Sequence, residues 1–114
     1  MFLKKGSIGK KLYPANGGNH TGTISLGKKV KNLYIVMNGF EMNYGDLSGD
    51  SFDNHVQDVA VNLSVLHTNG NDTAEVRCKF KLNDDNTSGD SFYALCDYVL
   101  IGEIYTTADA IHVW

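Results

Sequence analysis

The pentapeptide Ser-Gly-Asp-Ser-Phe occurs twice in this chain, at residues 48–52 and again at 88–92. The preceding residues also correspond, because the Phe-Glu-Met-Asn of 40–43 returns as the Phe-Lys-Leu-Asn of 80–83. Each copy is typical of a strand, a polar acidic loop and a second strand, so we expect two related hairpin units. Solenoids and propellers need three or more copies to bury a continuous core. Two copies therefore favour a pseudo-symmetric β-sandwich.

The clearest local pattern is a hairpin centred on Asn69-Gly70. Apolar and polar residues alternate over 59–65 and over 74–82, as in strands with one buried face. Asn-Gly favours a two-residue turn in which both residues have positive φ. The predicted opposite residues are Val65–Ala74, Leu63–Val76, Val61–Cys78 and Val59–Phe80 on the apolar face, and Asp58–Lys81 and Asn62–Arg77 on the polar face.

Two longer apolar segments complete the expected sheet. Residues 30–44 predict a strand with a bulge or bend at Asn38-Gly39. Residues 92–105 are apolar at both odd and even positions, which is typical of a central strand or of a strand at a subunit interface. Shorter strands are expected at 21–26 and 110–114, and no convincing helix is found.

The expected fold is all-β, an antiparallel sandwich or flattened barrel of about six to eight strands with an internal two-fold repeat. We expect one domain over residues 1–114, in which 1–19 can be an irregular basic arm. The predicted core is Val36, Phe40, Met42, Val59, Val61, Leu63, Val76, Cys78, Phe80, Leu82, Val99 and Ile101.

Charge is unevenly distributed along the chain. Residues 1–40 contain seven Lys and no acid, whereas residues 41–114 contain all 13 acids, one Arg and two Lys, so the charges of +7 and −10 sum to −3. A basic segment can bind nucleic acid, an anionic membrane or an acidic surface of a second subunit, or it can be a solvated edge strand. Nucleic acid is not expected as a partner, because the chain has a single Arg, the residue that supplies most bidentate phosphate and base contacts. A membrane is not expected as a partner either.

The two cysteines, Cys78 and Cys96, form no C-x-x-C pair and are expected to be buried reduced thiols. No apolar run approaches the length of a membrane-spanning helix, and the first residues lack the apolar stretch of a secretory signal. A cytoplasmic product is therefore expected. The alternative is a secreted chain whose signal is missing from the sequence.

The acidic loops are the candidate ligand site. The candidate ligand-binding residues are Asp46, Asp50, Asp53, Asp84, Asp85 and Asp90. Clustered carboxylate oxygens suit Ca²⁺ and also suit the hydroxyl groups of a sugar. Neither loop matches the calcium loop that ends in Glu, and the same residue types are ordinary in β-turns. Calcium, a polar ligand and plain turns therefore all stay open, and no other cofactor is expected.

Catalysis is not expected. Ser51, His55 and Asp58 could be read as a nucleophilic triad, but they lack a strand–turn–helix context and an oxyanion donor. No His or Cys has zinc-ligand spacing. We therefore expect a non-catalytic binding module, lectin-like in character, for a carbohydrate or small polar ligand. The alternative is a structural or assembly subunit of a homo-oligomer, of the kind encoded by phages or mobile elements.

Overall fold

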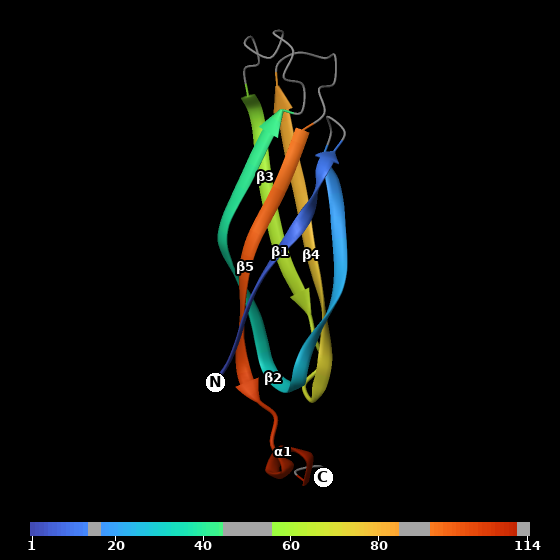
Figure 1. The fold of residues 1–114 in the computed structure, drawn as a ribbon, viewed down its shortest axis with the longest axis vertical. Helices are drawn as coiled ribbons and strands as arrows, with labels where there is room; N and C mark the ends of the chain where they lie inside the picture. Colours follow the sequence, from blue (N-terminus) through green and yellow to red (C-terminus); the bar gives the residue numbers. More distant parts are fainter. Residues whose placement is uncertain (14–16, 45–55, 85–91, 112–114) are drawn as a thin grey trace.

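A computed structural model of the chain describes residues 1–13, 17–44, 56–84 and 92–111. The elements are β1 (Phe2–Tyr13), β2 (Gly18–Tyr44), β3 (Val56–Leu66), β4 (Asn71–Asp84), β5 (Phe92–Ile104) and the short helix α1 (Thr107–Ile111). The strands form one antiparallel sheet in the order β1-β5-β2-β4-β3, which does not close (Figure 1). The all-β antiparallel prediction is confirmed. A sandwich of two separate sheets, a closed barrel and the internal repeat are not, and the described residues form five strands.

β2 is 27 residues long, and its two halves pair with different neighbouring strands. Residues 18–25 pair with β4, whereas residues 30–44 pair with β5. Between them the register breaks, and Gly27 has a φ of 79°, a conformation that favours glycine. The predicted strands at 21–26 and 30–44 are thus one continuous strand that bends at the base of the molecule (Figure 1). Two further register shifts fall between Lys31 and Tyr34 and between Met37 and Gly39, and the bulge was predicted at the second of these two places.

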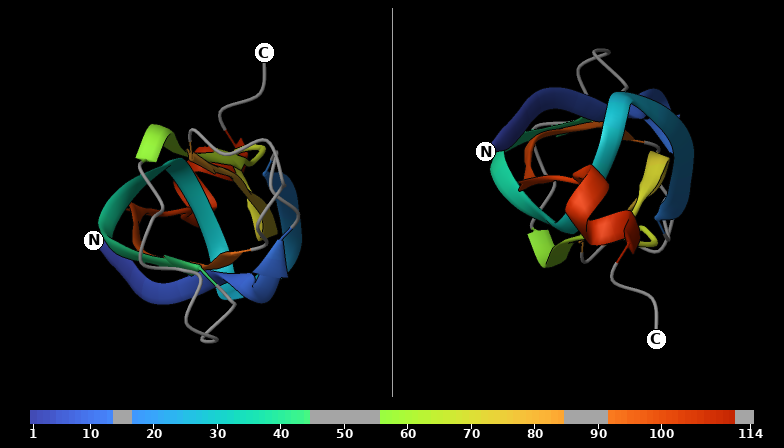
Figure 2. Two further views of the ribbon diagram at one scale, coloured as in Figure 1. Left: turned by 90° about the horizontal axis from the view of Figure 1, so that it is seen from above. Right: turned by 90° about the horizontal axis from the view of Figure 1, so that it is seen from below.

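The bend in β2 turns the sheet back on itself, so that β4 and β5 share an interior without being hydrogen-bonded neighbours. Viewed along the long axis, the strands surround this common interior (Figure 2). Alternate residues of β4 and β5 fill it together with residues from β1 and the bend. The buried core is Phe2, Ile8, Leu26, Val30, Ala74, Val76, Cys78, Phe80, Leu82, Phe92, Ala94, Cys96, Tyr98 and Leu100.

The predicted core is correct for β4 and incorrect for much of β2 and β5. Val76, Cys78, Phe80 and Leu82 are buried, and Met42, Val61 and Leu63 are partly buried against them. Val36, Phe40 and Val59 are exposed, and Val99 and Ile101 are half-buried. In β5 the even-numbered residues face the interior, which leaves the odd-numbered Val99 and Ile101 on the outside.

The repeated sequence does not produce repeated environments. Phe40 and Phe80 are equivalent in the repeat, yet Phe40 is 54 % exposed and Phe80 is 0 % exposed. The strands of each predicted hairpin unit are not neighbours either, because β2 lies beside β4 and β5, and among the described strands β3 pairs with β4 alone. Strand order, which the repeat does not specify, decides what each side chain meets.

The β3–β4 hairpin forms, but its register is two residues away from the prediction. Val65 lies opposite Val76 and Val61 opposite Phe80, and on the outer face Asn62 lies opposite Lys79. A slip of two residues keeps the same side chains on the same face. The other observed pairs are Val59–Leu82, Leu63–Cys78, Asp58–Asn83, Ala60–Lys81 and Ser64–Arg77.

Contacts with β2 explain the shifted register. Gly70 N donates to Val30 O at 2.8 Å, and Asn69 Oδ1 accepts from Asn32 N at 2.8 Å. Asn71 pairs with Val30 of β2 rather than with β3. Within the turn, Gly70 has a positive φ of 93° and Asn69 does not. The turn is therefore shaped by the neighbouring strand, and the prediction that both turn residues have positive φ is wrong.

Both ends of the chain differ from the prediction. Residues 2–13 form edge strand β1 rather than an irregular arm, because Phe2 and Ile8 are buried against β5. Near the C-terminus, α1 replaces the expected strand at 110–114, as far as the structure describes it. Thr106 N donates to Asp109 Oδ2 at 2.8 Å, and Asp109 N approaches Thr106 Oγ1 at 3.4 Å. This reciprocal capping satisfies backbone groups at the start of the helix.

Candidate binding surfaces

The predicted ligand residues fall almost entirely outside the part of the chain that the structure describes. Five of the six, Asp46, Asp50, Asp53, Asp85 and Asp90, lie outside the described residues. Asp84 ends β4 opposite Val56, with its side chain not described. Among the described residues, no group of three or more His, Cys, Asp or Glu side chains could hold a metal ion. The assignment of these carboxylates to a ligand or to Ca²⁺ stays a prediction.

The first surface that the structure does describe is the outer side of β1, β5 and the second half of β2, here called the apolar face. The register places Leu3, Ile101 and Tyr34 in one row across the three strands. The next row contains Lys5, Val99 and Val36. The exposed apolar side chains of the face, between 40 % and 56 % exposed, are Leu3, Tyr34, Val36, Tyr93 and Leu95.

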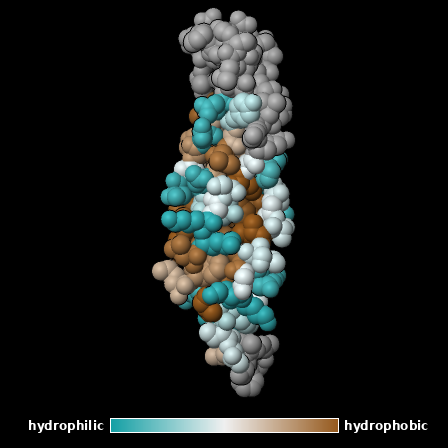
Figure 3. Space-filling model, viewed as in Figure 1, coloured by the Kyte–Doolittle hydropathy of each residue, from teal (hydrophilic) through white to brown (hydrophobic). Residues whose placement is uncertain are grey.

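This face follows from the unusual composition of β5. The sequence predicts a strand apolar on both sides, and β5 is indeed a central strand, between β1 and β2. Its even-numbered residues from Phe92 to Gly102 are buried, but no described element covers its odd-numbered ones. Hydrophobic residues accordingly reach the surface along the molecule, between hydrophilic ones (Figure 3). A polar row of Ser7 and Asp97 separates Leu95 and Tyr93 from the apolar rows at Val99 and Ile101. Exposed apolar groups of this kind mark interaction sites more often than single exposed residues do.

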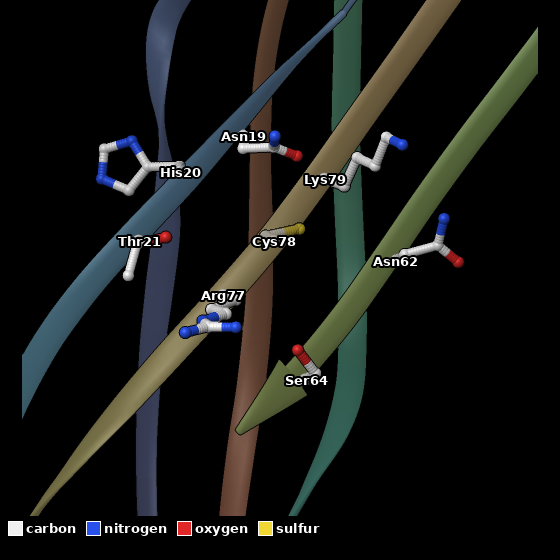
Figure 4. Close-up of a pocket in the computed structure, with 8 residues that line it drawn as sticks. All are labelled: Asn19, His20, Thr21, Asn62, Ser64, Arg77, Cys78 and Lys79. Atoms are coloured by element: carbon white, nitrogen blue, oxygen red, sulfur yellow. The ribbon is translucent and has the colours of Figure 1, made fainter. Parts of the chain in front are cut away.

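The second surface is a hollow on the outer side of β2, β4 and β3, here called the polar groove. It is formed by two residues from each strand: Asn19 and Thr21 from β2, Arg77 and Lys79 from β4, and Asn62 and Ser64 from β3 (Figure 4). The register aligns Thr21, Arg77 and Ser64 in one row and Asn19, Lys79 and Asn62 in the next. The hollow has a volume of about 380 Å³, and His20 and Cys78 complete its lining.

The polar groove carries positive charge and unused hydrogen-bonding groups. Arg77 Nη2 lies 2.9 Å from Glu75 Oε2, so its charge is partly balanced. Lys79 has no ion pair within the described part of the chain. The side chains of Asn62 and Ser64 likewise make no hydrogen bond to another described residue, and the same holds for Asn19 and Thr21. Each of these groups is free to bind a ligand.

Sequence reasoning found only half of the polar groove. The alternation of β3 and β4 placed Asn62 and Arg77 on a solvent-facing side, and that placement is confirmed. The β2 contribution was missed because residues up to 19 were expected to form an irregular arm. No sequence signal indicates that β2 pairs with β4 on one half and with β5 on the other. That arrangement depends on the bend at Gly27.

A third cluster, at the base of the molecule, is structural. Lys31 Nζ lies 2.7 Å from Asp109 Oδ1 and joins α1 to β2. The hydrogen bond from Lys31, followed by that from the Thr106 backbone, lowers the pKa of Asp109 to about 2. The same hydrogen bond raises the pKa of Lys31. Both groups are charged across the physiological range, and the pair holds the helix rather than a ligand.

The two thiols are buried and unsuited to nucleophilic chemistry. Cys78 and Cys96 are free and lie in the core, as the sequence predicts. Burial raises the pKa of Cys78 to about 12 and also raises the pKa of Cys96. The protonated thiol is a poor nucleophile and a poor metal ligand. These cysteines therefore act as small apolar core residues.

Comparison with known proteins identifies no relative: no family model, curated protein or solved structure matches the chain. Within the described residues, no helix is long and apolar enough to cross a membrane. The function proposed below is therefore based on the apolar face and the polar groove.

Proposed function

We propose that this protein is a structural subunit that self-associates, with the apolar face as the contact between copies. The observation that carries the proposal is a pair of adjacent apolar rows across β1, β5 and β2, in which the exposed Tyr34 and Val36 lie beside the half-buried Ile101 and Val99. Packing this sheet face on a second sheet would remove those side chains from water, at about 25 cal/mol for each Å² of apolar surface.

Charge on the margins of the face favours a second copy as the occupant. Lys5 lies on β1 at one margin, and Glu41 lies on β2 at the other. Two-fold packing can place the Lys5 margin of one copy against the Glu41 margin of the other, while Asp97 in the middle of the face accepts a hydrogen bond from Ser7 of its own chain. A closed dimer is also the commonest assembly of soluble chains. The sequence-level idea of a free basic arm is not needed, because the first Lys residues belong to edge strand β1.

The test is sedimentation velocity over a concentration series with a matched pair of variants. Val36→Lys places a charge on the apolar face, beside Val99 of the central strand, whereas Thr23→Lys places one on the outer side of the other half of β2. We expect the native protein and Thr23→Lys to dimerise, and Val36→Lys to stay monomeric with an unchanged melting temperature. Association should persist in 1 M salt, since apolar burial rather than charge dominates the contact. A native protein that stays monomeric at all concentrations, or equal dimerisation of both variants, would contradict the proposal.

The second candidate function is a non-catalytic binding module, lectin-like in character, as the sequence suggests. What supports it in the described residues is the polar groove with its free hydrogen-bonding groups. For the acidic loops, the test is thermal denaturation with and without millimolar Ca²⁺, because a ligand that binds only the folded state raises the melting temperature. An unchanged melting temperature would leave those residues as plain turns.

A further inference from the structure

The polar groove has a composition that restricts what it can bind. Its centre is cationic, with Arg77 and Lys79 two residues apart on the same face of β4. Its sides are neutral, formed by the amides of Asn19 and Asn62 and by the hydroxyls of Thr21 and Ser64. A matching ligand therefore carries negative charge near the middle and neutral polar groups around it.

Hydroxyl groups are the neutral partners that fit best. Asn, Ser and Thr side chains each offer both a donor and an acceptor, as a hydroxyl does. A nucleic acid fits less well, because no Phe, Tyr or Trp lines the groove to stack on a base and His20 is the one ring in its lining. The only Arg of the chain is also shared with Glu75. An acidic peptide supplies carboxylates but few hydroxyls for the flanking amides.

We propose that the polar groove binds an acidic oligosaccharide, with a uronate carboxylate on Lys79 and Arg77 and sugar hydroxyls on Asn19, Asn62 and Ser64. The proposal rests on the second candidate function and assigns it a site different from the acidic loops. The three strands hold the six side chains in fixed rows, so the site is preformed and needs no ordering of a loop on binding.

Glu75 gives this site a built-in competitor. Its carboxylate lies 2.9 Å from the Arg77 guanidinium and occupies part of the position that a ligand carboxylate would take. Removing that charge frees Arg77 for a bidentate contact with the ligand. Removing the Glu75 charge is therefore expected to increase the affinity for the ligand. A variant that merely loses its structure cannot show such an increase.

The experiment is titration calorimetry with hexagalacturonic acid, using maltohexaose as the neutral probe and single-stranded DNA as the nucleic-acid probe. Lys79→Gln should weaken binding of hexagalacturonic acid about tenfold, the usual effect of losing one charge-assisted hydrogen bond. Glu75→Gln should strengthen it about two- to fivefold, as expected for one exposed ion pair. The control Lys28→Gln removes an equal charge at the bend in β2 and should change affinity less than about twofold.

The possible outcomes separate the groove from the function on which it rests. If hexagalacturonic acid does not bind the native protein and a glycan array is blank, both the groove and the binding module are wrong. If it binds but Lys79→Gln and Lys28→Gln weaken it equally, the module stands and the groove is wrong. Tighter binding of single-stranded DNA than of the sugar acid would also overturn the proposal.

Discussion

Phe40 and Phe80 provide a direct test of the fold. The repeat predicts the same environment for both residues, whereas the structure buries one and exposes the other. Phe80 is 0 % exposed in the core, whereas Phe40 is 54 % exposed. We expect Phe80→Ala to lower the free energy of unfolding by about 3–5 kcal/mol, the usual cost of lost transfer energy and a residual cavity. Phe40→Ala should cost about 1 kcal/mol or less, since only half of its side chain is removed from water and no cavity results.

The assay is urea unfolding followed by circular dichroism, with thermal melts in parallel. For 114 residues the unfolding entropy is about 0.24 kcal/mol per degree, so Phe80→Ala should melt roughly 12–20 °C lower and Phe40→Ala less than about 5 °C lower. Val76→Ala and Val36→Ala repeat the comparison at a second pair of equivalent positions, with Val76 buried and Val36 exposed. Equal losses for both members of each pair would refute the structural assignment and restore the symmetric repeat.

Three other measurements test the base of the molecule and the core. Gly70→Ala should lower the free energy of unfolding by about 1–2 kcal/mol, because Gly70 has a φ of 93° and the new methyl group would lie 3.2 Å from the ring of Tyr105. Gly22→Ala is the control in the same urea assay. It should be tolerated, since nothing lies within 4 Å of its new methyl group. The pKa of Asp109 is lowered from 3.8 to about 2, so its ion pair with Lys31 stabilises the fold above pH 3.8, and this contribution disappears as the pH falls toward 2. The melting temperatures of the native protein and Asp109→Asn should therefore converge in acid. A difference that stays constant with pH would contradict the pairing. Cys78, with a pKa raised to about 12, and Cys96 should resist iodoacetamide at pH 8 in the native state and react fully in guanidinium chloride; rapid labelling of the native protein would refute their burial.

The sequence by itself determined the local pattern of the sheet. Alternation over β3 and β4 identified both strands and their buried faces, because side chains of a strand point alternately to its two sides. Asn69-Gly70 located the turn, Asn38-Gly39 located the bulge, and the both-sided apolar character of 92–105 identified a central strand. Each of these features depends on residues close together in the chain.

Only the tertiary structure decided the arrangement in space. The hairpin register slipped by two residues because Gly70 and Asn71 bond to Val30 of β2, a strand distant in sequence. The bend at Gly27 lets one strand serve two neighbours, which buries Phe80 and exposes Phe40 although the local sequences agree. The same bend brings Asn19 beside Lys79 and so forms the polar groove. Strand order depends on the total free energy of contacts between residues that are distant in sequence. A pattern of neighbouring residues does not give that total.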